Sequence, residues 1–399
     1  MAGIKLTPNS VSIGLYDLTV IFGVLISIHW LVKAFHKPNY VTICLVLIAS
    51  VQFVPLLAVF FSANDFQILR VLYASRMLEY FLFIPVLYLA AKNIKASTIF
   101  YSSTYILISI PVLVIMAGHP WGVFQYSWEL GAAYSLLFNY LLILRVHGAR
   151  NYKNTIFLLV AACVVLYTDQ RSPMIAVLFG IANYVWSSKG LGSKALMAVF
   201  LCSGILIAFG TENRLSNTIN EFDYLKISNV VDAGLSLAKM APSYESFVYE
   251  DRSVLTEDGS RDLSFNLRVR KWAYAFVNMN ELEYVIGLGP GYFGGAADSS
   301  IFRIFFETGV LGLLCWAMLL LRLYVKFKTS RLLLASMIIN GIFIDVFYSA
   351  RVICVFLVLF FLVSRSRLEL STSYRVAPFP SRLLKYPPNM STASTSQTS

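Results

Sequence analysis

The chain has little charge for its length. Only 13% of its 399 residues are Asp, Glu, Lys or Arg, whereas 58% are hydrophobic and the mean hydropathy is +0.69. Soluble domains carry about 25% charged residues. This scarcity excludes an ordinary soluble protein and predicts a polytopic integral membrane protein. We expect no soluble catalytic domain appended to it.

Residues in patterns that hold metals or nucleotides are also lacking. The five cysteines all lie in apolar runs, where they are not spaced for a metal cluster or an extracytoplasmic disulfide, so we interpret them as packing residues. No Asp-x-Asp metal motif occurs. The glycine-rich stretch GLGPGYFGG at 287–295 lacks the Lys-Ser/Thr ending of a nucleotide P-loop. We therefore expect no metal ion and no other cofactor.

The formal charge of +11 is distributed unevenly. Residues 210–299 contain 13 acidic and 8 basic side chains, a net of −5, so the remainder holds 24 basic against 8 acidic. That basic excess lies in short loops, where it sets membrane topology, and it does not form a nucleic-acid-binding face. We expect no nucleic-acid partner.

Apolar runs of membrane length recur along the chain. A helix needs about 20 apolar residues to cross a hydrocarbon core of roughly 30 Å. We predict an all-α fold of about eleven spans, give or take one. They lie near residues 13–32, 40–61, 69–91, 97–117, 129–147, 154–168, 173–187, 194–209, 300–325, 331–347 and 350–364.

Lys and Arg fall in alternate loops and in the C-terminal tail, which predicts that these segments are cytoplasmic. Four regions follow. Residues 1–209 form an N-terminal bundle of about eight spans, and 210–299 form a large, mostly helical external loop with an amphipathic helix. Residues 300–364 form a C-terminal bundle of about three spans, and 365–399 a disordered, basic, Ser/Pro-rich tail.

Charged residues at the external ends of spans are the first candidates for a site. Arg171 lies between two spans, and Pro173 suits the first turn of the following helix. An arginine beside the N–H groups of a helix N-terminus can hold an anion, and the alternative is an ion pair with Asp169. Asp345 and Arg351 flank the last external turn, where we expect water to reach them. Arg351 is a further candidate.

Residues 268–276 combine cations with aromatic side chains. Arg268, Arg270 and Lys271 precede Trp272 along a predicted helix. A helix at the level of the lipid headgroups is one interpretation, and we favour it for Lys271. For the two arginines, phosphate binding competes with it, because the guanidinium fork matches phosphate oxygens.

A third group of ionisable residues opens the span near 300–325. If a helix starts near Ser299, Asp298 caps it and Arg303 pairs with Glu307 one turn later. That arrangement requires no function. Three ionisable groups at the mouth of a span, beside an arginine-rich helix, are also typical of a site. Both interpretations stay open.

Motifs within residues 261–320 resemble the O-antigen polymerase and O-antigen ligase superfamily (Wzy and WaaL types). They are RVRKW at 268–272, GLGPG at 287–291 and FETGVLGLL at 306–314, with weaker support from QRSP at 170–173. The resemblance implies that Arg171 and Arg268 contact a diphosphate and that Glu307 belongs to the family's Glu-x-Gly. Nine residues before that glutamate the ligases usually carry histidine. This chain has Asp298, which favours a polymerase.

The resemblance implies a metal-independent glycosyltransferase of the bacterial inner membrane whose site faces the periplasm. Its donor is an undecaprenyl-diphosphate-linked oligosaccharide, and its acceptor is the terminal sugar of another lipid-linked repeat unit. Membrane lipids, a chain-length regulator and a flippase are further candidate partners. Expected diphosphate ligands are the arginines Arg171, Arg268, Arg270, Arg303 and Arg351. Expected catalytic carboxylates are Asp298, as base, and Glu307, as second base or as the group that orients Arg303.

Two other functions fit parts of the pattern. An O-antigen ligase would transfer the finished glycan to lipid A core or to a protein. A flippase or other transporter of lipid-linked oligosaccharide would also need arginines for the diphosphate, but transporters often have two related halves with broken helices. We see one asymmetric external loop and no internal repeat, which disfavours a transporter.

Overall fold

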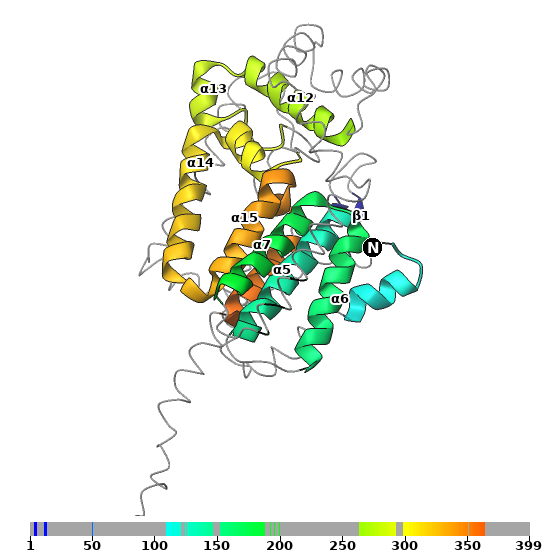
Figure 1. Ribbon diagram of the computed structural model, residues 1–399. Coiled ribbons are helices and arrows are strands. Elements are labelled where there is room, and N and C mark those ends of the chain that lie inside the picture. Colours follow the sequence, from blue (N-terminus) through cyan, green and yellow to red (C-terminus); the bar gives the residue numbers. More distant parts are fainter. Residues whose placement is uncertain are drawn as a thin grey trace, which may run out of the picture.

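The computed structural model describes residues 4–5, 12–13, 50, 109–120, 124, 126–146, 152–187, 192, 195, 199, 263–292, 298–349 and 351–363. This part of the chain is mainly helical (Figure 1). The described residues are helical as expected of an all-α fold, apart from a short antiparallel pair of two-residue strands, β1 (Ile4–Lys5) and β2 (Ser12–Ile13). The labelled helices are α5 (Ser127–Val146), α6 (Tyr152–Thr168), α7 (Arg171–Ser187), α12 (Leu263–Asn278), α13 (Glu281–Ile286), α14 (Ser300–Lys326) and α15 (Arg331–Phe343). Single turns η1 (Lys328–Ser330) and η2 (Val346–Tyr348), a further helix, Arg351–Val363, and a helical stretch at 109–116 are also present.

Several of these helices fall on predicted spans. Two of them, α5 with 20 residues and α14 with 27, are long and apolar enough to cross a membrane. The helices α6 and Arg351–Val363 are apolar but shorter. Apart from single residues, the predicted spans 13–32, 40–61, 69–91 and 194–209 lie outside the described residues, as do most of 97–117 and the tail. The number of eleven spans therefore stays a prediction.

Helix α5 is the centre of the bundle. It packs against α6, α7 and α15, and its residues from Glu129 to Leu144 are all buried. A helix that is apolar on every side requires such complete covering. Glycine permits the closest approach, because a Cβ on Gly180 of α7 would overlap the side-chain oxygen of Asn139.

Two buried hydrogen bonds tie α5 to its neighbours. The amide nitrogen of Asn139 donates to the carbonyl of Ala176 in α7 at 3.1 Å. The amide nitrogen of Asn340 in α15 donates to the hydroxyl of Ser135 at 3.0 Å. Small and polar residues at helix contacts are typical of helices that pack within membranes.

The two ends of the bundle differ in their charged residues. We call one end of the bundle the Glu129 end. Four helices begin there, namely α5, α7, α14 and Arg351–Val363. The side-chain amide of Gln170, just before α7, donates to the hydroxyl of Ser127 at the start of α5 at 3.2 Å. At the opposite, Arg145 end, Arg145 donates to Thr155 at 2.8 Å, and the turn between α14 and α15 carries Lys326, Lys328 and Arg331. The basic residues of these two loops therefore share one end.

Helices α12 and α13 lie beyond the Glu129 end, beside the start of α14 (Figure 1). The rings of Trp272 and Phe302 stack with centroids 4.2 Å apart, and Ala275, Met279 and Phe306 form a small buried cluster. Aromatic contacts of this kind fix the orientation of α12. The cationic positions of α12 are thereby held over the first turns of α14.

Helix α14 covers the predicted span over 300–325, and it is kinked at Gly309. Gly309 has φ 66° and ψ −168°, which is outside the helical region. The carbonyls of Phe306 and Glu307 lose their helical partners there and accept instead from the N–H groups of Leu288 at 2.7 Å and Gly289 at 3.1 Å. The glycine-rich turn thus supplies the hydrogen bonds that the break removes.

Candidate functional site

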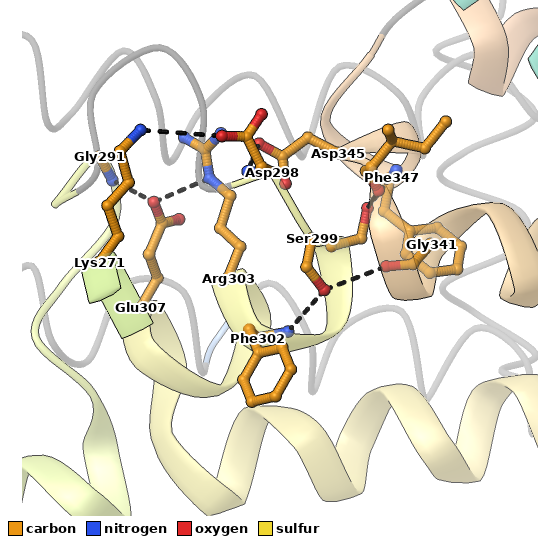
Figure 2. Close-up of polar contacts among 12 residues, drawn as sticks. Lys271, Gly291, Asp298, Ser299, Phe302, Arg303, Glu307, Gly341, Asp345 and Phe347 are labelled. Atoms are coloured by element: carbon orange, nitrogen blue, oxygen red, sulfur yellow. Dashed lines mark hydrogen bonds and ion pairs between the residues drawn. The ribbon is translucent and has the colours of Figure 1, made fainter. Parts of the chain in front are cut away.

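Six ionisable side chains from three segments of the chain meet at the first turns of α14. All of them except Arg268 are labelled in Figure 2. We divide them into an inner triad and an outer cluster. The inner triad is Arg303, Glu307 and Asp345. The outer cluster is Arg268, Lys271 and Asp298.

The inner triad is closed to solvent. Arg303 is 2% exposed, and its Nε donates to Oε1 of Glu307 at 2.9 Å while an Nη donates to Oδ2 of Asp345 at 3.4 Å. Its guanidinium also lies 4.1 Å from the ring centroid of Tyr348. Glu307 accepts a further bond from the N–H of Gly291 at 3.1 Å. Buried charges persist only with partners of this kind, so these residues form a structural support for the site.

The outer cluster is more accessible. The carboxylate of Asp298 is 30% exposed and lies 3.9 Å from Nε of Arg268 and 3.7 Å from Nζ of Lys271. Arg268 also donates to the carbonyl of Phe343 at 3.1 Å. The N–H of Asp298 donates to Oδ2 of Asp345 at 3.1 Å, so one carboxylate oxygen joins the outer cluster to the inner triad.

Asp298 does not cap α14, so the helix-cap interpretation is wrong. Ser299 is the N-cap, and its hydroxyl accepts from the N–H of Phe302 at 3.4 Å. Asp298 adopts φ 61°, a left-handed conformation that Asp and Asn tolerate better than most residues. This turn directs its carboxylate toward α12 instead of along the helix axis.

Two other expectations also need correction. Lys271 is only 8% exposed and points inward to Asp298, so it does not lie at the headgroup surface as we expected. Asp345 is 5% exposed, so it is not an open, hydrated turn residue. Both corrections have one cause, which is that the partners of these residues lie on distant segments of the chain. The side chain of Arg270 lies outside the described residues.

Arg171 and Arg351 lie at the Glu129 end but on other helices. Arg171 begins α7. Arg351 donates to Oε2 of Glu129 at 2.8 Å, and Ser349 donates to Oε1 of the same carboxylate at 2.7 Å. The sequence analysis missed Glu129, although a carboxylate in the first turn of an apolar helix is a signal that could have found it.

The charges of the site suit an anionic ligand on its outer side. The inner triad has one cation and two carboxylates, whereas the outer cluster has two cations and one exposed carboxylate. An incoming anion would meet Arg268 and Lys271, and Asp298 would be the carboxylate nearest to water. Within the described residues, no group of three or more His, Cys, Asp or Glu side chains could hold a metal ion.

The fold and the site define a helical bundle with two helices of membrane-spanning length and a buried ionic network at one end. Comparisons with protein-family models, with curated proteins and with solved structures found no match. The resemblance to the O-antigen polymerase and ligase superfamily therefore stays a prediction from the sequence motifs.

Proposed function

We propose that this chain is a multi-pass inner-membrane polymerase that joins oligosaccharide repeat units carried on undecaprenyl diphosphate. The observation that carries the proposal is the outer cluster. Two cations and an exposed carboxylate lie together at the start of a helix long enough to cross a membrane. This combination suits transfer of a glycan from a lipid-linked diphosphate, because it offers both an anion site and a proton acceptor.

In this proposal, the cations stabilise the leaving diphosphate. Breaking the bond between C1 of the sugar and the diphosphate oxygen builds negative charge on that oxygen, so fixed cations bind the transition state more tightly than the ground state. Arg268 makes the direct contact, and Arg171 and Arg351 border the same end of the bundle. Buried Arg303 acts by positioning Glu307 and Asp345.

Asp298 is the proposed general base. Its carboxylate is 30% exposed, whereas Glu307 is 1% exposed and already accepts from Arg303 and Gly291. A base must come within hydrogen-bonding reach of the acceptor hydroxyl, and only an accessible carboxylate meets that condition. Glu307 then orients Arg303, and the acceptor hydroxyl on the terminal sugar of the other lipid-linked repeat unit gives its proton to Asp298.

The orientation follows from the charges at the two ends of the bundle. Arg145, Lys326, Lys328 and Arg331 lie at one end, which the positive-inside rule assigns to the cytoplasm. The outer cluster lies at the opposite end, which faces the periplasm in this proposal. Repeat units that a flippase delivers to that face then reach the site directly.

The test is the polysaccharide made by a deletion strain and by the purified protein. Deletion is expected to leave surface glycans of one repeat unit, visible as a single short band on a gel. Loss of all attached glycan would indicate a ligase, and lipid-linked repeats held on the cytoplasmic side would indicate a flippase. Either result would overturn the polymerase assignment. Purified protein given only lipid-linked repeats is expected to produce chains of several units.

The base is tested by Asp298→Asn in the same assay. The amide cannot accept the proton, and loss of general-base catalysis typically costs about 10²- to 10⁴-fold in rate. Asparagine keeps the left-handed backbone and the N–H bond to Asp345, so membrane insertion is expected to be unchanged. Because Arg268 and Lys271 lose their counter-ion, the rates are compared at a temperature below the melting temperature of both proteins. A variant with full activity would remove Asp298 from the mechanism.

A further inference from the structure

We infer that α13 is an interfacial anchor, whose exposed apolar face of Leu282 and Val285 enters the acyl-chain boundary of the bilayer at the Glu129 end. The partner is a lipid surface, and the contact is apolar. This inference uses neither the glycan chemistry nor the inside-outside orientation of the bundle. It requires only that α14 crosses the bilayer.

Helix α13 has an apolar face that the rest of the protein leaves open. Leu282 is 63% exposed and Val285 is 46% exposed. At about 100° per residue, these two side chains and Ile286 lie within roughly one third of the helix surface. Glu281 and Glu283 flank Leu282 on either side. An apolar strip between charged margins is typical of a helix that lies in a membrane surface.

The length of α14 places this face at the edge of the bilayer. A span of about 20 residues that ends at Lys326 begins near Phe306. At that level, the N–H of Leu288, just after α13, donates to the carbonyl of Phe306 at 2.7 Å. Val285 also meets α14 there, because a Cβ on Gly309 would overlap its backbone. Helix α13 is therefore tied to α14 at the depth where hydrocarbon gives way to headgroups.

The open face of α13 continues the side of α14 that faces lipid. After Gly309, exposed apolar side chains follow one stripe of α14, and they are Val310, Leu311, Leu314, Met318, Leu321 and Val325. At about 100° per residue this stripe covers roughly one third of the helix surface, and the buried residues of this part lie on the other side. Val285 lies beside the start of the stripe, where its backbone meets Gly309. A bilayer that covers the stripe therefore also reaches α13.

An aromatic cluster lies at the same level. The ring of Phe276 is 5.5 Å from that of Phe305 and 6.2 Å from that of Tyr284, measured between centroids. The Tyr284 hydroxyl donates to the carbonyl of Phe276 at 2.8 Å. Tyrosines with an apolar ring and a hydrogen-bonded hydroxyl are concentrated at membrane interfaces. The lipid contact that we expected of Lys271 in α12 is thus made by the neighbouring helix.

Lipid suits this face better than a protein partner does. Stable protein interfaces bury about 1,200 Å² or more, and two side chains on a six-residue helix offer far less. Lipid needs no such area, because it already covers the adjoining stripe of α14. Glu281 and Glu283, which are the charged residues of α13, are both acidic. The contact is therefore made with acyl chains and gains nothing from anionic headgroups.

The experiment measures spin-label accessibility in full-length protein without its five native cysteines, in phosphatidylcholine nanodiscs. Leu282→Cys and Val285→Cys carry the label. Collisions with oxygen, which concentrates among acyl chains, are compared with collisions with a water-soluble nickel complex. We expect an excess of oxygen collisions that corresponds to a depth of about 5–10 Å. Leu314→Cys, at a depth of about 12 Å, is the buried-in-lipid control, and Lys328→Cys is the aqueous control.

Three results would overturn the inference. Nickel collisions at both α13 positions as frequent as at Lys328→Cys would place the face in water. Few collisions with either reagent would show that protein covers it. Entry into the bilayer only after phosphatidylglycerol replaces phosphatidylcholine would assign the contact to charge. The Leu314→Cys label verifies insertion in each preparation. Because no sugar transfer is measured, this inference and the polymerase proposal can fail independently.

Discussion

At the scale of single residues, Asp345 connects the two parts of the site. One of its carboxylate oxygens accepts from Arg303 at 3.4 Å and from the N–H of Asp298 at 3.1 Å. The first bond helps to neutralise a buried guanidinium, and the second holds Asp298 in a conformation that few residues adopt. The inner triad therefore determines where the outer cluster can present its carboxylate.

Replacing Arg303 with methionine tests the inner triad. The change leaves Glu307 and Asp345 as buried carboxylates without their shared cation, which typically costs about 3–5 kcal/mol. We expect a clear fall in the melting temperature and in the yield of inserted protein. Arg322→Met, an exposed position on the same helix, is the matched control and is expected to change stability little. Equal melting temperatures for both variants would contradict the structural role of Arg303.

At the scale of elements, the break in α14 joins the segment that follows α12 and α13 to the bundle. Backbone hydrogen bonds from Leu288 and Gly289 fill the positions that the broken helix leaves open. The fit depends on glycine on both sides, because a Cβ on Gly287 would overlap the backbone of Glu307 and a Cβ on Gly309 would overlap that of Val285. Glu307, whose side chain belongs to the inner triad, lies directly before this contact.

Gly309→Ala is expected to destabilise this contact. Alanine at a left-handed position costs about 1–3 kcal/mol in strain, and the overlap with Val285 adds to that cost. Gly118→Ala is the matched control, because Gly118 has φ +93° but nothing within 4 Å of an added Cβ. Thermal unfolding should therefore show a larger loss for Gly309→Ala than for Gly118→Ala. Equal losses would mean that the close packing contributes nothing.

A second element-scale prediction concerns the contact of α5 with α7. Gly180→Ala places a methyl group on the Asn139 side chain, and such overpacking typically costs about 1–3 kcal/mol. Adding Asn139→Ala makes room for that methyl group. We expect the double variant to lose less stability than the sum of the two single variants, measured by thermal unfolding. Strict additivity would show that the two side chains do not compete for the same space.

At the scale of the whole molecule, the bundle is polarised. The Glu129 end gathers the inner triad, the outer cluster and the Glu129–Arg351 pair, whereas the Arg145 end carries the basic turns. A membrane favours such a separation, because cytoplasmic loops retain Lys and Arg and buried charges require partners. This polarity predicts which end reaches the cell exterior.

Cysteine labelling of intact cells tests the orientation. In a background without the five native cysteines, Tyr126→Cys places an exposed thiol at the Glu129 end, and Lys328→Cys places one at the Arg145 end. A membrane-impermeant maleimide is expected to label only the first until the cells are permeabilised. Labelling of Lys328→Cys from outside would reverse the proposed topology.

The sequence by itself determined the helical character of the described segments and the positions of several helices, because hydrophobicity and local spacing act among residues within a turn or a single run. It also indicated the i, i+4 pair of Arg303 and Glu307. Only the tertiary structure decided that Lys271 turns inward, that Asp298 faces cations instead of capping a helix, and that α14 breaks at Gly309. These features depend on contacts between distant positions, such as Arg303 with Asp345, 42 residues apart, and Arg268 with Phe343, 75 residues apart. Local patterns carry no information on such pairs, because their geometry exists only after the helices have packed.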